Sequence, residues 1–205
     1  MKIGILGTRG IPNHYGGFEQ FAEFFATFAA GRGHEVYVYN SHNHPYQEKV
    51  FNNVHIVHCY DPEHKIGTVG QFIYDLNCII DARKRDFDIL LQLGYTSSAI
   101  WFSLHPKKAI VITNMDGLEW KRTKYSKKVQ KALQIAERLA VKKSDFLIAD
   151  SIGIQKYIKE KYQKESTYIA YGAHNFKTPN PEILKEYQVE KEQFNMIMAR
   201  FEPEN

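Results

Sequence analysis

The sequence predicts a doubly wound α/β domain built on a mostly parallel sheet, and three observations lead to that prediction. Short apolar runs alternate with longer stretches of helical periodicity along most of the 205 residues. Parallel strands need crossover connections, so strands that alternate with helices favour parallel pairing. Runs such as ILL, IVI and LIA lack polar alternation, which is typical of strands covered on both faces.

The expected elements follow one another in a regular order. The first strand is 2–6, and a glycine-containing loop at 7–17 leads into a helix at 18–32, which Gly31 and Gly33 end. Later expected elements are strands at 35–39 and 54–57, a helix at 68–83, a strand at 88–93, a helix at 97–104, a strand at 109–113, a helix at 127–143, a strand at 146–149, a helix at 152–162 and a strand at 167–170.

The last part of the chain follows another pattern. TPNP at 178–181 is typical of a linker, and a short helix at 182–187 and a strand-like run at 195–199 come after it. A lone strand after a linker has no partner inside a finished domain. We therefore expect residues 1–177 to form one domain, and 178–205 to form a linker and the first strand of a truncated second domain.

Composition narrows the class of protein. With 43% hydrophobic and 24% charged residues the chain is typical of a soluble globular protein. Cys59 and Cys78 show no metal-ligand spacing and are expected to be buried thiols, and the nine histidines form no paired metal motif, so no metal is expected. The N-terminus is typical of a strand rather than a signal peptide, and no run approaches the length of a membrane span. We expect a cytoplasmic protein.

The first candidate site is the loop after the first strand. Gly16 and Gly17 precede a helix whose N-terminus offers N–H groups to an anion. A tight turn with no ligand is the alternative. The spacing of Gly7 and Gly10 does not match the dinucleotide pattern G-x-G-x-x-G, and the second strand ends in YNS without an acid for an adenine ribose. Both features argue against a dehydrogenase.

The second candidate site is the loop after the strand at 109–113. Its polar and aromatic side chains include Asn114, Asp116, Glu119, Trp120 and Arg122. Carboxylates there would bind sugar hydroxyls or accept a proton, and Trp120 would stack on a sugar face. A polar loop with a turn at Asp116 and Gly117 is the alternative.

Two further strand ends carry candidate residues. Asp150 and Ser151 follow the strand at 146–149, where Ser151 is also suited to be a helix N-cap. Tyr171 and Gly172 follow the strand at 167–170, where a plain turn is the alternative. The carboxyl ends of parallel strands meet at one edge, so these residues are expected to face one cleft.

Taken together, the sequence resembles the GT-B glycosyltransferases of retaining family 4, in particular the bacterial branch with rhamnosyltransferases of capsule and polysaccharide synthesis. The segments that carry the resemblance are KIGILGTRGIPNHYGGFEQFAE, TNMDGLEWKRTKYS, LIADSIGIQKYI, YIAYGAH and MARFEPEN. It implies two Rossmann-like domains that face each other across a cleft. The N-terminal domain would bind the acceptor and the C-terminal domain would bind the nucleotide sugar.

The resemblance also implies roles for particular residues. Gly16 and Gly17 would approach the donor diphosphate, and Arg200 matches an arginine that contacts it. Asp116 stands where many relatives place a histidine near the reacting sugar, and the lysine that usually follows Arg200 is missing. The remaining cleft residues would be Asn13, Tyr15, Glu19, Asn114, Glu119, Trp120, Arg122, Asp150, Ser151, Tyr171 and Gly172.

The implied chemistry is transfer of a sugar from a nucleoside diphosphate to an acceptor hydroxyl with retention at the anomeric carbon. The acceptor would be a saccharide or a lipid-linked saccharide, and the nucleotide sugar would be a co-substrate with no other cofactor or metal. A sugar-nucleotide epimerase of the same architecture is the alternative within enzymes.

A basic stretch at 121–143 carries nine cations against one acid, Glu137. These cations are Lys121, Arg122, Lys124, Lys127, Lys128, Lys131, Arg138, Lys142 and Lys143. We expect a peripheral contact with anionic lipid at the inner face of the membrane, and a solvated helix face is the equal alternative. A basic module that binds nucleic acid is a weaker alternative because the sequence carries no nucleic-acid motif.

Overall fold

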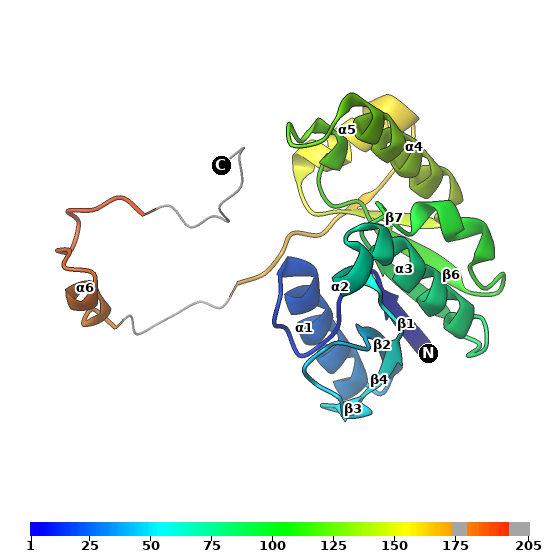
Figure 1. Ribbon diagram of the computed structural model, residues 1–205, viewed down its shortest axis with the longest axis horizontal. Coiled ribbons are helices and arrows are strands. Elements are labelled where there is room, and N and C mark those ends of the chain that lie inside the picture. Colours follow the sequence, from blue (N-terminus) through cyan, green and yellow to red (C-terminus); the bar gives the residue numbers. More distant parts are fainter. Residues whose placement is uncertain (174–179, 197–205) are drawn as a thin grey trace.

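The computed structural model describes residues 1–173 and 180–196 and confirms the predicted α/β class (Figure 1). The sheet has eight strands in the order β3-β4-β2-β1-β5-β6-β7-β8, and every pairing is parallel except that of β3 with β4. The strands are β1 (Lys2–Leu6), β2 (Glu35–Ser41), β3 (Val50–Phe51), β4 (Val54–Cys59), β5 (Ile89–Leu93), β6 (Ile110–Asn114), β7 (Phe146–Ala149) and β8 (Thr167–Tyr168).

Helices alternate with the strands along most of the chain, and α6 follows the last strand. They are α1 (Gly17–Gly31), α2 (Glu63–Ile66), α3 (Val69–Ala82), the 3₁₀ helices η1 (Ala99–Leu104) and η2 (Glu119–Lys121), α4 (Lys127–Lys143), α5 (Ile152–Tyr162) and α6 (Ile183–Glu186). Four predicted elements, β1, α4, β7 and α5, have the predicted bounds. The expected helix at 97–104 is a shorter 3₁₀ turn, and β3 and α2 were not predicted because two to four residues are too short to show a period.

The end of α1 shows why its boundary was readable from sequence. Gly33 has φ +82, in the left-handed region that favours glycine. The N–H of His34 donates to the carbonyl of Ala29 and that of Gly33 to the carbonyl of Ala30, at 3.2 and 2.9 Å. These two bonds form a Schellman motif that satisfies the last carbonyls of the helix.

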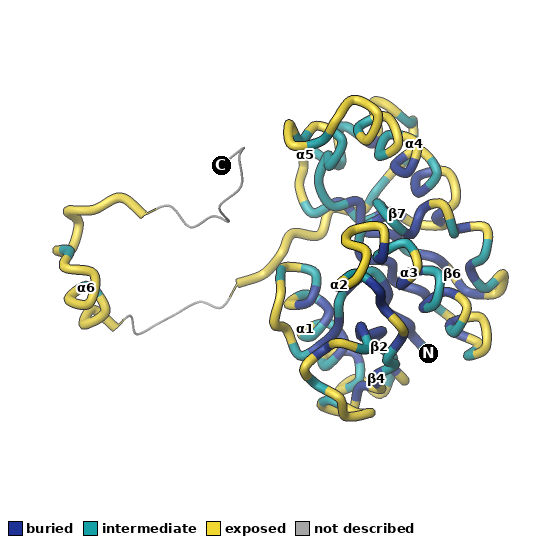
Figure 2. Tube along the Cα trace, in the orientation of Figure 1, coloured by how far each residue is buried: buried dark blue, intermediate teal, exposed yellow. Residues whose placement is uncertain are grey.

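Apolar side chains pack on both faces of the sheet. Figure 2 shows the strands of the sheet with many buried residues along them. On one face α1 packs Ala22, Ala26 and Ala29 against β1, β2 and β4. On the other face α3 and η1 cover β1 and β5, and α4 and α5 form a further cluster with β7. Cys59 and Cys78 are buried free thiols on this second face, as predicted.

The expectation that both faces of the central strands are covered is wrong for part of the first face. Ile110 and Phe146, on β6 and β7, are 44% and 60% exposed among the described residues. The physical reason is that α1 contacts β2 and β4 but does not extend over β6 and β7. A strand with apolar residues on both faces is therefore not always covered on both faces by other described elements of this chain.

The last predicted elements fall partly outside the described residues. The domain boundary at 177 and residues 178–179 of the linker at 178–181 lie outside the described residues, and so do residues 197–199 of the expected strand at 195–199. Asn195 and Met196 are not in a strand, and β8 ends at Tyr168 rather than at 170. Arg200 also lies outside the described residues.

Candidate functional site

The strand order reverses between β1 and β5, and the carboxyl ends of the parallel strands meet at one edge of the sheet. From β1 the chain builds outward through β2 to one side, and from β5 it builds through β6, β7 and β8 to the other. Doubly wound domains bind ligands at such a switch point, outside the carboxyl ends of the strands. The predicted site residues that the structure describes lie at the last residue of β6 or in the segments that follow β1, β6, β7 and β8, including the first turn of α1 and the 3₁₀ helix η2.

The loop after β1 is held firmly from the protein side. The buried Glu19 carboxylate accepts hydrogen bonds from the Arg9 backbone N–H at 2.8 Å and from the Thr8 hydroxyl at 3.3 Å. Asn40, at the end of β2, exchanges two hydrogen bonds with the backbone of Ile11. Glu19, which was predicted as a cleft residue, lies in the first turn of α1, and its carboxylate holds the loop after β1 through its hydrogen bonds with Arg9 and Thr8.

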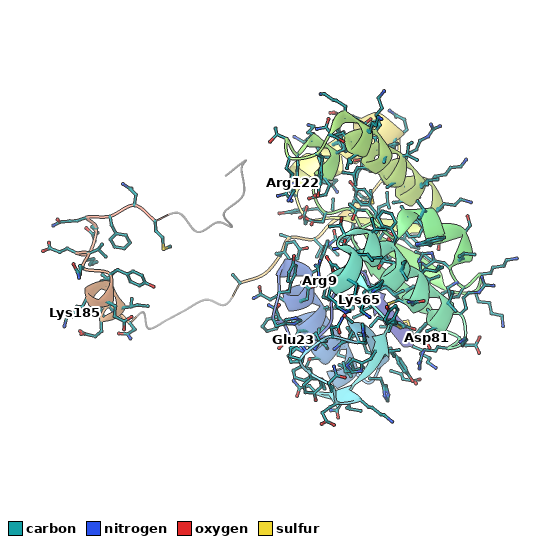
Figure 3. All side chains as sticks on the ribbon, viewed as in Figure 1. Arg9, Glu23, Lys65, Asp81, Arg122 and Lys185 are labelled. Atoms are coloured by element: carbon teal, nitrogen blue, oxygen red, sulfur yellow. The ribbon has the colours of Figure 1, made fainter. Side chains whose placement is uncertain are left out.

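Arg9 fixes the outer side of the same loop (Figure 3). Its guanidinium forms a bidentate ion pair with Glu63 of α2, with nitrogen–oxygen distances of 2.9 to 3.2 Å. It also lies 4.0 Å from the ring centroid of Tyr15. The predicted residues Asn13 and Tyr15 are exposed beside it, and the Asn13 side chain accepts a hydrogen bond from the Tyr15 backbone at 3.0 Å.

The N-terminus of α1 opens directly from this loop. Gly16 is the N-cap and has no side chain to cap the helix. A Cβ atom built on Gly17 would meet nothing within 4 Å, and the φ of Gly17 is not in the left-handed region. Packing therefore does not require glycine at 17, whereas close approach of a ligand to the backbone would.

Four predicted residues come together after β6, β7 and β8. Burial raises the pKa of Tyr171, and the carboxylates of Asp116 and Asp150 raise it further, while a hydrogen bond from Asn114 acts in the opposite direction. Asn114 is 4% exposed. Its Oδ1 atom and Oδ1 of Asp150 are buried and accept no hydrogen bond from the described residues. Both oxygens can only accept, so a donor from solvent or from a ligand would satisfy them.

A hollow of about 380 Å³ joins this cluster to the helix N-terminus. Its walls are Gly17, Gln20, Phe21, Phe24, Tyr171, Gly172 and Ala173. The rings of Phe21 and Tyr171 meet edge to face with centroids 6.1 Å apart. The hollow thus brings together Gly17, Tyr171 and Gly172, which are far apart in sequence and were predicted separately.

Glu137 of α4 anchors the loop that contains η2, and it was not predicted as a site residue. Glu137 of α4 is 1% exposed, and its carboxylate accepts hydrogen bonds from Trp120 at 3.0 Å and from Tyr157 at 2.7 Å. It also accepts from Lys161 at 2.9 Å and from Tyr162. The signal was available, because position 137 falls on the apolar stripe of α4 between the buried Ala136 and Ala140.

The remaining predicted residues have local partners. Arg122, labelled in Figure 3, pairs with Glu119 at 3.5 Å, and the indole of Trp120 lies 5.2 Å from the ammonium of Lys161. The Ser151 hydroxyl accepts the Ile154 N–H at 3.3 Å, which confirms the N-cap reading. These contacts show how the four side chains are held and leave their roles toward a ligand as predictions.

A buried acid on α3 was also missed. Asp75 is 6% exposed and accepts a 2.6 Å hydrogen bond from the Ser97 hydroxyl, in the loop after β5. Burial raises the pKa of Asp75 to about 7. No sequence pattern marks it, because its burial depends on where the loop after β5 lies.

The described residues offer neither a cluster of metal ligands nor a membrane-spanning helix. Within 1–173 and 180–196, no three or more His, Cys, Asp or Glu side chains are grouped so that they could hold a metal ion. Nor does any helix in these ranges have the length and apolar character needed to cross a bilayer.

Comparison with solved structures finds the same fold in a sucrose-phosphate synthase from Thermosynechococcus elongatus. The match has a TM-score of 0.67 at 14% identity and covers 92% of this chain and 53% of that one, so this chain spans about half the length of the synthase chain. A second chain of the same synthase matches with a TM-score of 0.55 at 12% identity, covering 83% of this chain and 87% of that one. At these identities the likeness shows the fold alone, which is that of a GT-B glycosyltransferase domain.

Sequence comparison supplies the family. No curated protein matches the chain. The family model described as "Domain of unknown function (DUF1972)" matches residues 1–174, which is most of the chain. The chain therefore belongs to the DUF1972 family.

Proposed function

We propose that this chain is the acceptor-binding half of a retaining GT-B glycosyltransferase of the family 4 type. The observation that carries the proposal is the hollow at the switch point. One wall is the uncapped N-terminus of α1 at Gly17, and the opposite wall is formed by Tyr171 and its neighbours. A site with an anion-binding end and a hydroxyl-binding end suits a nucleoside diphosphate sugar and a saccharide acceptor.

The donor end rests on backbone groups. Gly16 and Gly17 let a diphosphate approach the first N–H groups of α1, whose helix dipole favours negative charge. Arg200 would add a guanidinium on the side of the second domain. This arrangement stabilises the charge that develops on the leaving diphosphate, a large part of the barrier reduction in such transfers.

The acceptor end rests on oxygen atoms. The buried Oδ1 atoms of Asn114 and Asp150 have no donors among the described residues, so they suit the hydroxyl groups of a saccharide or lipid-linked saccharide. Asp116 lies in the same cluster and is the residue that we place nearest the reacting centre. In the reaction the bond from the anomeric carbon to the phosphate oxygen breaks, a bond to the acceptor oxygen forms on the same face, and the acceptor proton passes to the leaving phosphate.

The biological setting is also part of the proposal. The resemblance to rhamnosyltransferases suggests a rhamnosyl donor and a role in cell-surface polysaccharide synthesis. The exposed cations on α4 suit contact with anionic lipid at the cytoplasmic face of the membrane, where a lipid-linked acceptor would lie.

The test uses the full-length enzyme and a panel of nucleotide sugars with saccharide and lipid-linked acceptors. We expect one donor to be turned over and Asp116→Ala to reduce transfer at least about 100-fold, within the range of general acid–base and positioning effects. Glu48→Ala changes an exposed carboxylate that has no ion pair within the described ranges, so it is the matched control and should keep full activity. A product that is an epimerised nucleotide sugar would support the epimerase, and absence of any donor binding would contradict both enzymes.

A further inference from the structure

A second hollow lies between the C-terminal ends of α4 and α5. It measures about 250 Å³ and is lined by Arg138, Val141, Lys142, Tyr162 and Lys164. The chain passes from the end of α4 into the start of β7, and from the end of α5 toward the start of β8 (Figure 1). The hollow therefore lies at the amino edge of the sheet, away from the candidate site at the carboxyl edge.

Positive charge dominates this hollow. Three of its five lining residues are cationic and none is acidic. Arg138 and Lys142 are four residues apart on α4, so they project from the same side of the helix. In the part of the chain that the structure describes, neither forms an ion pair.

Lys164 is held in place with capacity to spare. Its ammonium donates to the carbonyl oxygens of Val141 at 2.7 Å and Ser144 at 2.6 Å, at the end of α4. An ammonium has three N–H groups, so one remains for a ligand. Lys164 also offsets the negative end of the α4 dipole, which would otherwise repel an anion.

Two carboxylates close in sequence to these residues, Asp145 and Glu137, accept hydrogen bonds from groups other than the three cations of the hollow. Asp145, whose charge acts on Lys164 against the effect of burial, accepts the Val111 N–H at 2.8 Å. Glu137 is saturated by donors that include Lys161 and Tyr162. Within the ranges that the structure describes, none of the three cations of the hollow forms an ion pair with a carboxylate.

We propose that this hollow is a phosphate-binding site, which takes the phosphate group of an anionic lipid or of a soluble phosphate ester. A guanidinium matches two phosphate oxygens in a bidentate manner, and two ammonium groups add charge-assisted donors around a doubly charged group. Val141 and Tyr162 supply an apolar wall for the carbon chain of the ester. The proposal does not depend on the sugar-transfer reaction at the other edge of the sheet.

The experiment measures binding of inorganic phosphate and pyrophosphate by calorimetry to the full-length protein. In parallel, it measures co-sedimentation with phosphatidylcholine vesicles that contain or lack phosphatidic acid. Arg138→Gln with Lys142→Gln removes two charges from the hollow. Lys107→Gln with Lys108→Gln removes two exposed charges from the loop before β6 and is the matched control. Circular dichroism confirms that each variant is folded, and sugar transfer is assayed separately.

We expect the Arg138 and Lys142 double variant to weaken binding at least tenfold and the control to change it less than twofold. Saturable binding of inorganic phosphate or pyrophosphate without vesicle binding would support a soluble phosphate ester. Vesicle binding that requires phosphatidic acid, Arg138 and Lys142 and that pyrophosphate displaces would support a lipid headgroup. Equal weakening in both double variants would overturn the proposal, because it would show only net charge. Absence of saturable binding to every probe would overturn it as well.

Discussion

Two groups of buried polar side chains in this domain differ in the number of hydrogen-bond donors around them. The Glu137 carboxylate is surrounded by donors from Trp120, Tyr157, Lys161 and Tyr162. The Oδ1 atoms of Asn114 and Asp150 are also buried, yet they meet no donor in the ranges that the structure describes. A carboxylate with several donors stabilises the contacts among the segments that supply them, whereas an oxygen without a donor has capacity for a hydrogen bond from solvent or from a ligand.

Asp75 lies between these extremes. It is buried like Glu137, but in the described ranges its carboxylate accepts a hydrogen bond from Ser97 alone. Its pKa is raised to about 7 because burial penalises the charged form more than one hydroxyl compensates for it. The three cases form a series in which the number of donors predicts whether removal of the group destabilises the fold.

The largest effect is expected for Glu137→Ala. Removal of this carboxylate leaves a lysine, an indole N–H and phenol hydroxyls without their shared acceptor, so we expect a loss of about 3–5 kcal/mol in the free energy of unfolding. Urea unfolding measures it. The exposed Glu160→Ala on α5 is the control and should change stability by less than about 0.5 kcal/mol. A similar small loss in Glu137→Ala would remove the distinction between the two groups.

Asp75 predicts a pH effect of intermediate size. Its pKa is raised in the folded state, so the folded protein keeps a proton that the unfolded chain has released. Stability should therefore fall as the pH rises from about 4 to about 7 and then level off, by about 1.4 kcal/mol for each unit of pKa difference. Urea midpoints at pH 5 and pH 8 measure this change. Asp75→Asn should show a smaller loss between the two, and an equal loss in both proteins would rule out Asp75 as its source.

Asn114→Ala and Asp150→Ala should separate function from stability. Neither oxygen has a donor in the described ranges, so we expect stability to change by less than about 1 kcal/mol. In the full-length enzyme we expect the KM for the acceptor to rise about tenfold while the KM for the donor stays within twofold. A loss of stability as large as that of Glu137→Ala would show that these oxygens are structural.

The smallest stability effect is expected for Gly17→Ala. A Cβ at 17 meets nothing within 4 Å, so the fold should be as stable as before or slightly more stable. Binding of the donor diphosphate should weaken, because the methyl group stands where the ligand approaches the backbone. Gly10→Ala is the contrast, since Gly10 has φ +123 and a Cβ there would lie 2.4 Å from Asn40. Unchanged donor binding in Gly17→Ala would remove Gly17 from the site.

Local sequence patterns predicted the order of the elements and several of their ends. Period and capping are local properties, so α4, α5 and β1 were predicted with the observed bounds and Ser151 was foreseen as an N-cap. The same reasoning placed candidate residues at strand ends, because parallel strands direct their carboxyl ends to one edge of the sheet.

Tertiary contacts determine which of those residues are buried hydrogen-bond acceptors and which line a hollow. Glu19 and Glu137 appear as ordinary acids in the sequence, and both are buried acceptors in the structure. The donors of Glu19 come from the loop before its helix, and donors on η2 and α5 converge on Glu137. Tyr171 and Gly17 are 154 residues apart in number and line one hollow. The burial of a polar atom and the count of its donors depend on segments that meet in space, and no local pattern in the chain specifies them.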